Sequence, residues 1–139
     1  MLVNKENILN YIPQRVPFVM IDALHEANET SFESSFLIEN DNLFLENNCL
    51  SESALIENIA QTCAAGFGYV ATQNGQAAGG MGFIGAISKL EVFAYAAMGD
   101  QIHTSIKVLS SFGGIHLIEG VASCQETALL TCQLKIVLA

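Results

Sequence analysis

Residues 51–73 read SESALIENIAQTCAAGFGYVATQ and contain the most apolar segment of the sequence. The serines at its start are good helix N-caps, and Glu52 suits the positive end of a helix dipole. The apolar side chains that follow surround the helix and do not form one stripe: Leu55, Ile56, Ile59, Ala60, Cys63, Ala64, Phe67 and Val70. A helix that is apolar on nearly every side is buried, so we expect a long central helix that ends at Asn74 and Gly75.

The rest of the sequence alternates in the manner of β-strands. In residues 30–38, apolar and serine side chains share one face, and only Leu37 breaks the pattern. Residues 39–50 are rich in asparagine and are expected to form a loop. The expected strands are residues 18–25, 30–38, 82–93, 100–110, 115–125 and 129–138, after a short helix at 4–11. The short connections favour one α+β domain over residues 1–139, in which an antiparallel sheet wraps the helix.

Composition limits the classes of function. The 139 residues carry a net charge of −9 with only five basic residues, which excludes a nucleic-acid surface. The hydrophobic fraction of 51% favours an oligomer or a binding site for an apolar ligand. The four cysteines form no CxxC pair and the N-terminus does not resemble a signal peptide, so a reduced, cytoplasmic protein is expected. Polar residues interrupt the apolar helix, so it is not expected to span a membrane.

Four glycines fall close together before the third expected strand: Gly79, Gly80, Gly82 and Gly85. Strand-like residues follow them, whereas a nucleotide-binding loop is followed by a helix. The glycines are therefore expected to let a strand pass close to the helix or to a ligand. The sequence indicates neither a cofactor nor a metal site.

Glu57 is the first candidate for chemistry. It falls in the second turn of the expected helix, beside Leu55, Ile56 and Ile59. A carboxylate with little access to water suits a general acid, and Gln61 lies one turn further on the same face, within hydrogen-bond reach. The same stripe is also compatible with a solvated helix face or a polar seam in a dimer. The histidines have no motif around them and are expected at the surface: His25, His103 and His116.

Three blocks of the sequence, taken in their order along the chain, resemble the motifs of a known family. They read IPQRVPFVMID (12–22), ALIENIAQ (54–61) and FIGAISKLEVF (83–93), the last followed by GDQI (99–102). These blocks resemble the β-hydroxyacyl-ACP dehydratases, hot-dog proteins that open with Leu-Pro-His-Arg-x-Pro and carry a helix acid followed by Ala-Gln. The resemblance covers nearly the whole chain and is strongest with the branch found with aryl-polyene and related pigment synthesis.

The resemblance implies a hot-dog dimer, homomeric or heteromeric, with an acyl tunnel at the interface. It implies a thioester of acyl carrier protein or coenzyme A as substrate, and Glu57 as the acid that protonates the departing 3-hydroxyl. Backbone N–H groups at the helix N-terminus would polarise the thioester. We expect substrate-binding residues at Gln61, Ser53, Phe83, Gly85 and Arg15. Arg15 and Lys89 are also the basic residues available to an acidic carrier protein.

The sequence departs from the family at the positions of the catalytic base. Leu43 stands where the Gly-His-Phe-Pro-Gly motif has its histidine, and Gln14 stands where Leu-Pro-His-Arg has its own. Ser51 and Glu52 replace the Pro-Gly pair before the helix. Neither leucine nor glutamine is a base near neutral pH, and losing a general base typically lowers the rate by about 10²–10⁴-fold.

Three hypotheses remain at the level of sequence. The first is a 3-hydroxyacyl-thioester dehydratase in which another group acts as base. The second is a non-catalytic hot-dog protein that binds acyl chains or is the silent partner of an active homologue. The third is an acyl-thioester hydrolase on the same fold, with the helix carboxylate activating water.

Overall fold

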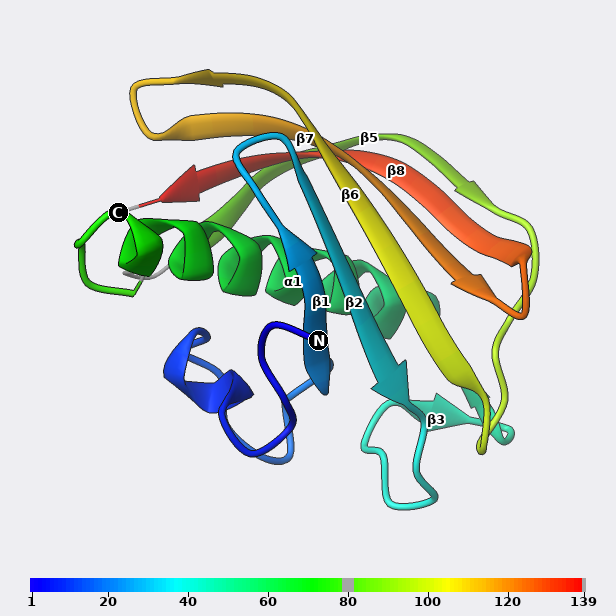
Figure 1. Ribbon diagram of the computed structural model, residues 1–139. Coiled ribbons are helices and arrows are strands. Elements are labelled where there is room, and N and C mark those ends of the chain that lie inside the picture. The colour runs from blue at the N-terminus through cyan, green and yellow to red at the C-terminus, as the bar shows by residue number, and fades with distance from the viewer. Residues whose placement is uncertain (79–81, 139) are drawn as a thin grey trace.

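The computed structural model describes residues 1–78 and 82–138, in which one long helix, α1 (Glu52–Gln73), lies against a curved antiparallel sheet (Figure 1). The sheet has six strands in the order β1-β2-β6-β7-β8-β5. Its strands are β1 (Ala23–Ala27), β2 (Ser31–Leu37), β5 (Gly82–Val92), β6 (Gln101–Phe112), β7 (Ile115–Cys124) and β8 (Thr127–Leu138). A small pair, β3 (Leu45–Glu46) and β4 (Cys49–Leu50), precedes the helix, and η1 (Ile8–Asn10) lies near the N-terminus. The expected α+β architecture is confirmed.

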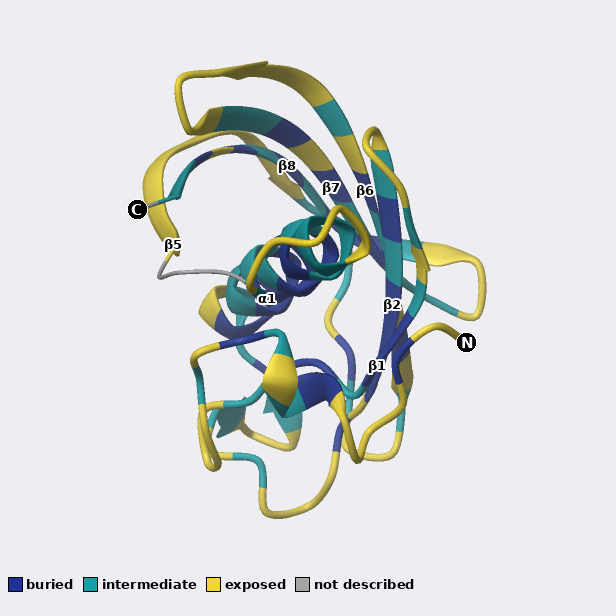
Figure 2. Ribbon diagram, turned by 60° about the vertical axis from the view of Figure 1, so that its left-hand side comes forward, coloured by how far each residue is buried: buried dark blue, intermediate teal, exposed yellow. Residues whose placement is uncertain are grey.

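Helix α1 begins where the sequence places its cap. The Ser51 hydroxyl accepts a hydrogen bond from the N–H of Ala54 at 3.3 Å, which satisfies one of the free donors of the first turn. The helix lies inside the curve of the sheet, as Figure 2 shows. Leu55, Ile59 and Cys63 are fully buried there, so apolar burial holds the helix in place.

Two glycines allow the helix and the sheet to approach closely. A Cβ on Gly66 of α1 would collide with the ring of Phe32, which is fully buried on β2. A Cβ on Gly120 of β7 would lie 2.6 Å from Cγ2 of Ile59 on α1. The Phe32 ring also meets Phe67 edge-on, with centroids 4.9 Å apart. These contacts pack α1 closely against β2 and β7.

The largest departure from the expected elements is at residues 18–25. The first strand begins at Ala23, and the segment before it is held by side chains of α1 through backbone groups of Phe18 and Met20. Hydrogen-bond partners on the helix thus replace a strand ladder there. The expected helix at 4–11 is a 3-10 turn of three residues, and residues 45–50 form the β3–β4 pair within the expected loop.

Strand β5 is the exposed edge of the sheet. Every residue from 82 to 91 is exposed, on both faces of the strand (Figure 2). Its apolar side chains include Phe83 (52% exposed) and Ile87 (45% exposed). Gly82 and Gly85 lie on β5, whereas Gly79 and Gly80 lie outside the described residues. None of the helices in the described ranges is long and apolar enough to cross a membrane.

Candidate active site

A stripe of polar side chains on α1 organises the site. Ser53, Glu57 and Gln61 follow one another at intervals of one helical turn and share a face. Gln61 Nε2 donates to Glu57 Oε1 at 3.1 Å and to the carbonyl of Phe18 at 2.9 Å, and Gln61 Oε1 accepts from the N–H of Met20 at 2.6 Å. Because Gln61 is only 1% exposed, this side chain fixes one oxygen of Glu57 and ties it to residues 18–20.

Asn58 extends the polar network in the opposite direction. Its Nδ2 donates to the carbonyl of Met20 at 2.7 Å, and its Oδ1 accepts from the hydroxyl of Thr104 on β6. Thr62 donates to the carbonyl of Asn58 at 2.8 Å and contacts the hydroxyl of Ser34 on β2 at 2.7 Å. These side chains are buried, so the network fixes α1 against the sheet and against residues 18–20.

A cavity of about 220 Å³ opens beside Glu57. Its polar side chains are Glu57 and Gln14, which come from segments 43 positions apart. The remaining wall is small or apolar and comes from the N-terminal segment, α1, β5 and β8: Pro13, Ala60, Ala64, Gly82, Phe83, Ile84, Ile136 and Leu138. Glu57 is half-buried where it lines this cavity.

Gln14 is the second polar group of this cavity. Its Oε1 is buried and, among the described residues, has no hydrogen-bond partner. Gln14, which the sequence resemblance aligns with a family histidine, therefore lines the same cavity as Glu57.

The remaining predicted positions divide between the cavity and other places. Phe83 lines the cavity, whereas Gly85 lies at an irregularity in the pairing of β5 with β8. Ser53 is exposed one turn before Glu57. Arg15 is exposed, and its Nη1 donates to the carbonyl groups of Ile12 (2.8 Å) and Gln14 (2.7 Å). Leu43 is 57% exposed in the loop before β3 and does not line the cavity.

The three histidines lie away from this cavity. His25 Nε2 contacts the Ser35 hydroxyl at 2.7 Å on the outer face of the sheet, and its ring stacks on His103 with centroids 6.3 Å apart. Burial lowers the pKa of His25, and the neighbouring imidazole of His103 lowers it further. His116 contacts Ser111 at 2.7 Å, and burial lowers its pKa. The described lining of the cavity therefore includes no imidazole.

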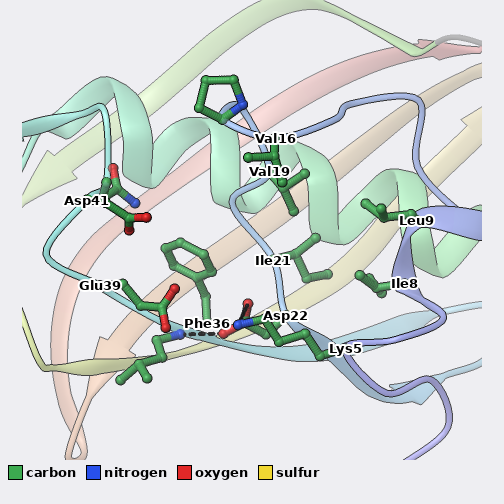
Figure 3. Close-up of a pocket in the computed structure, with 13 residues that line it drawn as sticks. Lys5, Ile8, Leu9, Val16, Val19, Ile21, Asp22, Phe36, Glu39 and Asp41 are labelled. Atoms are coloured by element: carbon green, nitrogen blue, oxygen red, sulfur yellow. Dashed lines mark hydrogen bonds and ion pairs between the residues drawn. The ribbon is translucent and has the colours of Figure 1, made fainter.

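Figure 3 shows another cavity, of about 200 Å³, between the N-terminal segment and the end of β2. Asp22 lies in its wall, accepts a hydrogen bond from the N–H of Leu37 at 2.8 Å, and lies 3.9 Å from the Lys5 ammonium. Burial raises the pKa of Asp22, against the opposing effects of the Leu37 N–H and Lys5. Three carboxylates but no unpaired buried donor face this space, and it lies apart from Glu57.

The two buried cysteines are free thiols in the core. Burial raises the pKa of the Cys63 and Cys132 thiols, that of Cys132 to about 11, so both stay protonated at neutral pH. Within residues 1–78 and 82–138, no group of three or more His, Cys, Asp or Glu side chains is arranged to hold a metal ion.

Sequence reasoning missed the residues that give the cavity its shape. Ala60 and Ala64 lie next to the Glu57 stripe and leave space because their side chains are small, and Ile136 and Leu138 close it from the last strand. The two alanines, spaced four residues apart after Glu57, could have indicated open space beside the acid. The sequence could not indicate that β8 closes the cavity, because this depends on how β8 pairs with β5.

The comparisons place the chain in a family. Residues 6–139 match the model of the ApeP-like family, described as ApeP dehydratase. No curated protein matches the sequence. Among solved structures, the dehydratase heterocomplex ApeI:P from Xenorhabdus doucetiae superimposes with a TM-score of 0.88 at 18% identity, covering 95% of this chain and 90% of that chain.

More distant structures share the fold. The PaaI protein from the phenylacetic acid degradation operon of E. coli matches with a TM-score of 0.64 at 11% identity, over 82% of this chain and 80% of that chain. Smu.793 from Streptococcus mutans, bound to acetyl CoA, matches with a TM-score of 0.68 at 9% identity, over 94% and 97%. The expected hot-dog fold and the resemblance to dehydratases are thus confirmed, and the chain belongs to the ApeP-like dehydratase family.

Proposed function

We propose that this protein is one half of a heteromeric 3-hydroxyacyl-thioester dehydratase. In this proposal Glu57 is the general acid, and a related hot-dog subunit supplies the base. The observation that carries the proposal is the cavity that Glu57 and Gln14 both line, with no imidazole in its described lining. The candidate acid thus shares its cavity with a residue that cannot accept a proton near neutral pH.

The hydrogen bond to Glu57 leaves one carboxyl oxygen for the proposed proton transfer. Gln61 Nε2 donates to Oε1, so Oε2 is the oxygen through which Glu57 would give a proton. In the reaction, the base removes the C2 proton, the C2–C3 double bond forms, the C3–O bond breaks, and Glu57 gives its proton to the leaving hydroxyl, which departs as water.

Strand β5 supports a hot-dog partner. An exposed sheet edge with apolar side chains on both faces is a template for pairing with another strand. Phe83 and Ile84 belong both to this edge and to the cavity wall, so a subunit that pairs with β5 would also border the space beside Glu57. The similar solved structure is described as a dehydratase heterocomplex, which favours a heteromeric partner over a second copy of this chain.

The thioester carrier is proposed to dock mainly on the partner subunit. Acyl carrier proteins are acidic, and this chain has a net charge of −9. The guanidinium of Arg15 is already engaged with two backbone carbonyl groups. Charge reversal at Arg15 is therefore expected to affect carrier binding less than charge reversal on basic residues of the partner, which binding measurements with the complex will test.

The central experiment measures dehydration with and without the partner. The chain is co-expressed with a related hot-dog protein that retains the Leu-Pro-His-Arg histidine, and enoyl formation from a 3-hydroxyacyl-ACP is followed. We expect the complex to be active and the isolated chain to be inactive. Glu57→Gln in the complex is expected to lower the rate by about 10²–10⁴-fold. Glu52→Gln, which changes an acid in the first turn of the same helix, is the matched control and is expected to retain activity.

Two other outcomes would replace the proposal. Full activity of a complex carrying Glu57→Gln would show that this chain is the silent, acyl-binding partner, which the absent base on this chain favours. Release of free thiol from an acyl thioester, lost in Glu57→Gln, would identify a hydrolase. Turnover by the isolated chain at the rate of the complex would contradict a base supplied by the partner.

A further inference from the structure

Both backbone polar groups of Met20 are bound by side chains of α1. The N–H of Met20 donates to Gln61 Oε1 at 2.6 Å, and its carbonyl accepts from Asn58 Nδ2 at 2.7 Å. All three residues are at most 1% exposed, so these bonds form in a place that excludes water. In the described chain no strand ladder holds this segment, because β1 begins only at Ala23. The two helix side chains therefore fix the peptide groups of Met20.

The amide of Gln61 satisfies all its partners in only one orientation. Its Oε1 faces the N–H of Met20, so its Nε2 donates to the carbonyl of Phe18 at 2.9 Å and to Glu57 Oε1 at 3.1 Å. An amide turned end for end would set its oxygen against two acceptors and leave the Met20 N–H without one. The position of Met20 thus determines whether Gln61 presents a donor to Glu57.

Asn58 is itself oriented by a hydroxyl group of the sheet. Its Oδ1 accepts a hydrogen bond from Thr104 on β6, which leaves its Nδ2 for the carbonyl of Met20. Thr104 is fully buried, and a buried polar group that loses its partner is costly. A continuous series of hydrogen bonds therefore joins β6 to the candidate acid. Its members, in order, are Thr104, Asn58, Met20, Gln61 and Glu57.

We propose that Thr104 and Asn58 are positioning residues for Glu57. Neither residue lines the cavity beside Glu57. The Thr104 hydroxyl keeps the Asn58 amide on Met20, and Met20 keeps the donor of Gln61 on Glu57 Oε1. This inference rests on the proposed function for the reaction and adds the residues that hold the acid in place for it. Because the effect is on the geometry of proton transfer, it is expected in kcat and not in KM.

Ser34 offers a matched control next to Thr104. The two residues lie opposite each other on β2 and β6, and both are fully buried. The Ser34 hydroxyl contacts Thr62, which donates to the main-chain carbonyl of Asn58. That carbonyl belongs to the helix backbone and is not part of the series that leads to Glu57. Removal of either hydroxyl therefore takes away one buried hydrogen bond, but only the loss at Thr104 breaks the series.

The test measures enoyl formation by the co-expressed complex, at a temperature at which circular dichroism shows every variant fully folded. Thr104→Val keeps the shape of the side chain but removes its hydroxyl, and is expected to lower kcat about tenfold with KM within about twofold of the wild type. Thr104→Ser loses a methyl group but keeps the hydroxyl, and is expected to retain kcat. Ser34→Ala is expected to retain kcat as well. A purely structural role would instead order the kcat values by stability.

Hydrogen exchange followed by NMR tests the same series without catalysis. The N–H of Met20 is bound by Gln61, so its exchange reports on the bond that orients the Gln61 amide. In the isotope-labelled full chain, Thr104→Val is expected to speed exchange at Met20 about tenfold relative to the amides of β7. Ser34→Ala is expected to leave this relative rate unchanged. Scaling to β7 removes the effect of global stability on exchange.

The positioning role and the proposed function fail separately. If the complex dehydrates its substrate and Thr104→Val has the wild-type kcat, the proposed function stands and the positioning role is wrong. Equal losses of kcat in Thr104→Val and Ser34→Ala, or in Thr104→Val and Thr104→Ser, would also overturn the role, because packing and not the hydroxyl would then be responsible.

Absence of enoyl product from every complex would make the proposed function wrong, and the exchange measurement would then decide alone. An unchanged relative rate at Met20 in Thr104→Val would remove the hydrogen-bond series as well. Faster exchange in Thr104→Val but not in Ser34→Ala would leave the positioning of Glu57 intact without that reaction.

Discussion

Glu57 and Asn58 are neighbours in the sequence with opposite tasks. Glu57 is half-buried at a cavity, while Asn58 is fully buried and joins Met20 to Thr104. One step along a helix rotates the side chain by about 100°, so consecutive residues face different surroundings. The polar stripe that favoured either a solvated face or a dimer seam therefore divides into a structural side and a site side.

Asn58→Ala tests the structural side. The substitution leaves the Met20 carbonyl and the Thr104 hydroxyl without their partner in a buried place. Each unpaired buried group costs about 1–3 kcal/mol, so we expect the free energy of unfolding to fall by about 2–4 kcal/mol in urea titrations. Asn40→Ala, at an exposed loop position, is expected to change it by less than about 0.5 kcal/mol. Equal effects of the two substitutions would contradict the network.

The buried carboxyl group of Asp22 is expected to make the free energy of unfolding depend on pH. Burial raises its pKa above the unfolded value of 3.8, so the unfolded chain ionises first as the pH rises. The stability contributed by this group is complete below about pH 4 and is lost as the pH rises through the raised pKa. Asp22→Asn is therefore expected to stabilise the protein more at pH 7 than at pH 4 in urea titrations.

The control for Asp22→Asn is a substitution that removes the same charge at an exposed position. Asp41→Asn removes an equal charge at an exposed position in the wall of the same cavity. It is expected to show a smaller difference between pH 7 and pH 4. If both variants show the same pH dependence, net charge and not the burial of Asp22 is responsible.

At the scale of elements, the helix and the sheet are joined through small residues. Gly66→Ala would normally stabilise a helix by about 1 kcal/mol, because alanine has the higher helix propensity. Here the added methyl group meets the buried ring of Phe32. Overpacking of this kind costs about 1–3 kcal/mol, so we expect a net loss of stability in thermal or urea unfolding.

Gly85→Ala is the matched glycine substitution on β5. Its Cβ would lie at ordinary contact distance, 3.4 Å from Cγ2 of Val137. It is expected to change the free energy of unfolding by less than about 0.5 kcal/mol. If Gly66→Ala stabilises the protein instead, α1 and β2 can move apart to accommodate the methyl group, and the proposed overpacking is wrong.

At the scale of the molecule, the exposed β5 edge implies association. Ile87 on β5 lies opposite the buried Leu134 of β8 and shares its face of the sheet. A lysine on an edge strand opposes pairing with another chain. Ile87→Lys is therefore expected to abolish co-purification with the hot-dog partner and to give a monomer by light scattering.

Leu37→Lys is the control for the association experiment. Leu37 is 39% exposed at the end of β2, a strand separated from β5 in the sheet order. The variant is expected to retain the complex. Loss of the complex in both variants would place the interface elsewhere or indicate a general effect of added charge.

The uneven charge also belongs to the whole molecule. Residues 1–57 hold most of the acidic side chains, whereas β5 carries both Lys89 and Glu91. Pairing along β5 therefore meets little electrostatic opposition. The acidic N-terminal half opposes the approach of an acidic carrier protein, which agrees with docking on the partner.

The sequence by itself determined the central helix, most strands and the pairing of Glu57 with Gln61. These depend on local periodicity: a cap at Ser51, apolar residues on all sides of residues 51–73, and a spacing of one helical turn. Strand alternation likewise needs only neighbouring residues, and it predicted β2 and β6 to within one or two residues at each end.

Only the tertiary structure decided how residues 18–22 are held and which side chains share a cavity with Glu57. Residues 18–22 read as a strand locally, but Gln61 and Asn58 bind their backbone groups from about 40 positions away. Gln14 and Glu57 line one cavity only once α1, β5 and β8 enclose a common space. Local patterns carry no information on such distant contacts, because they arise when separate segments pack together.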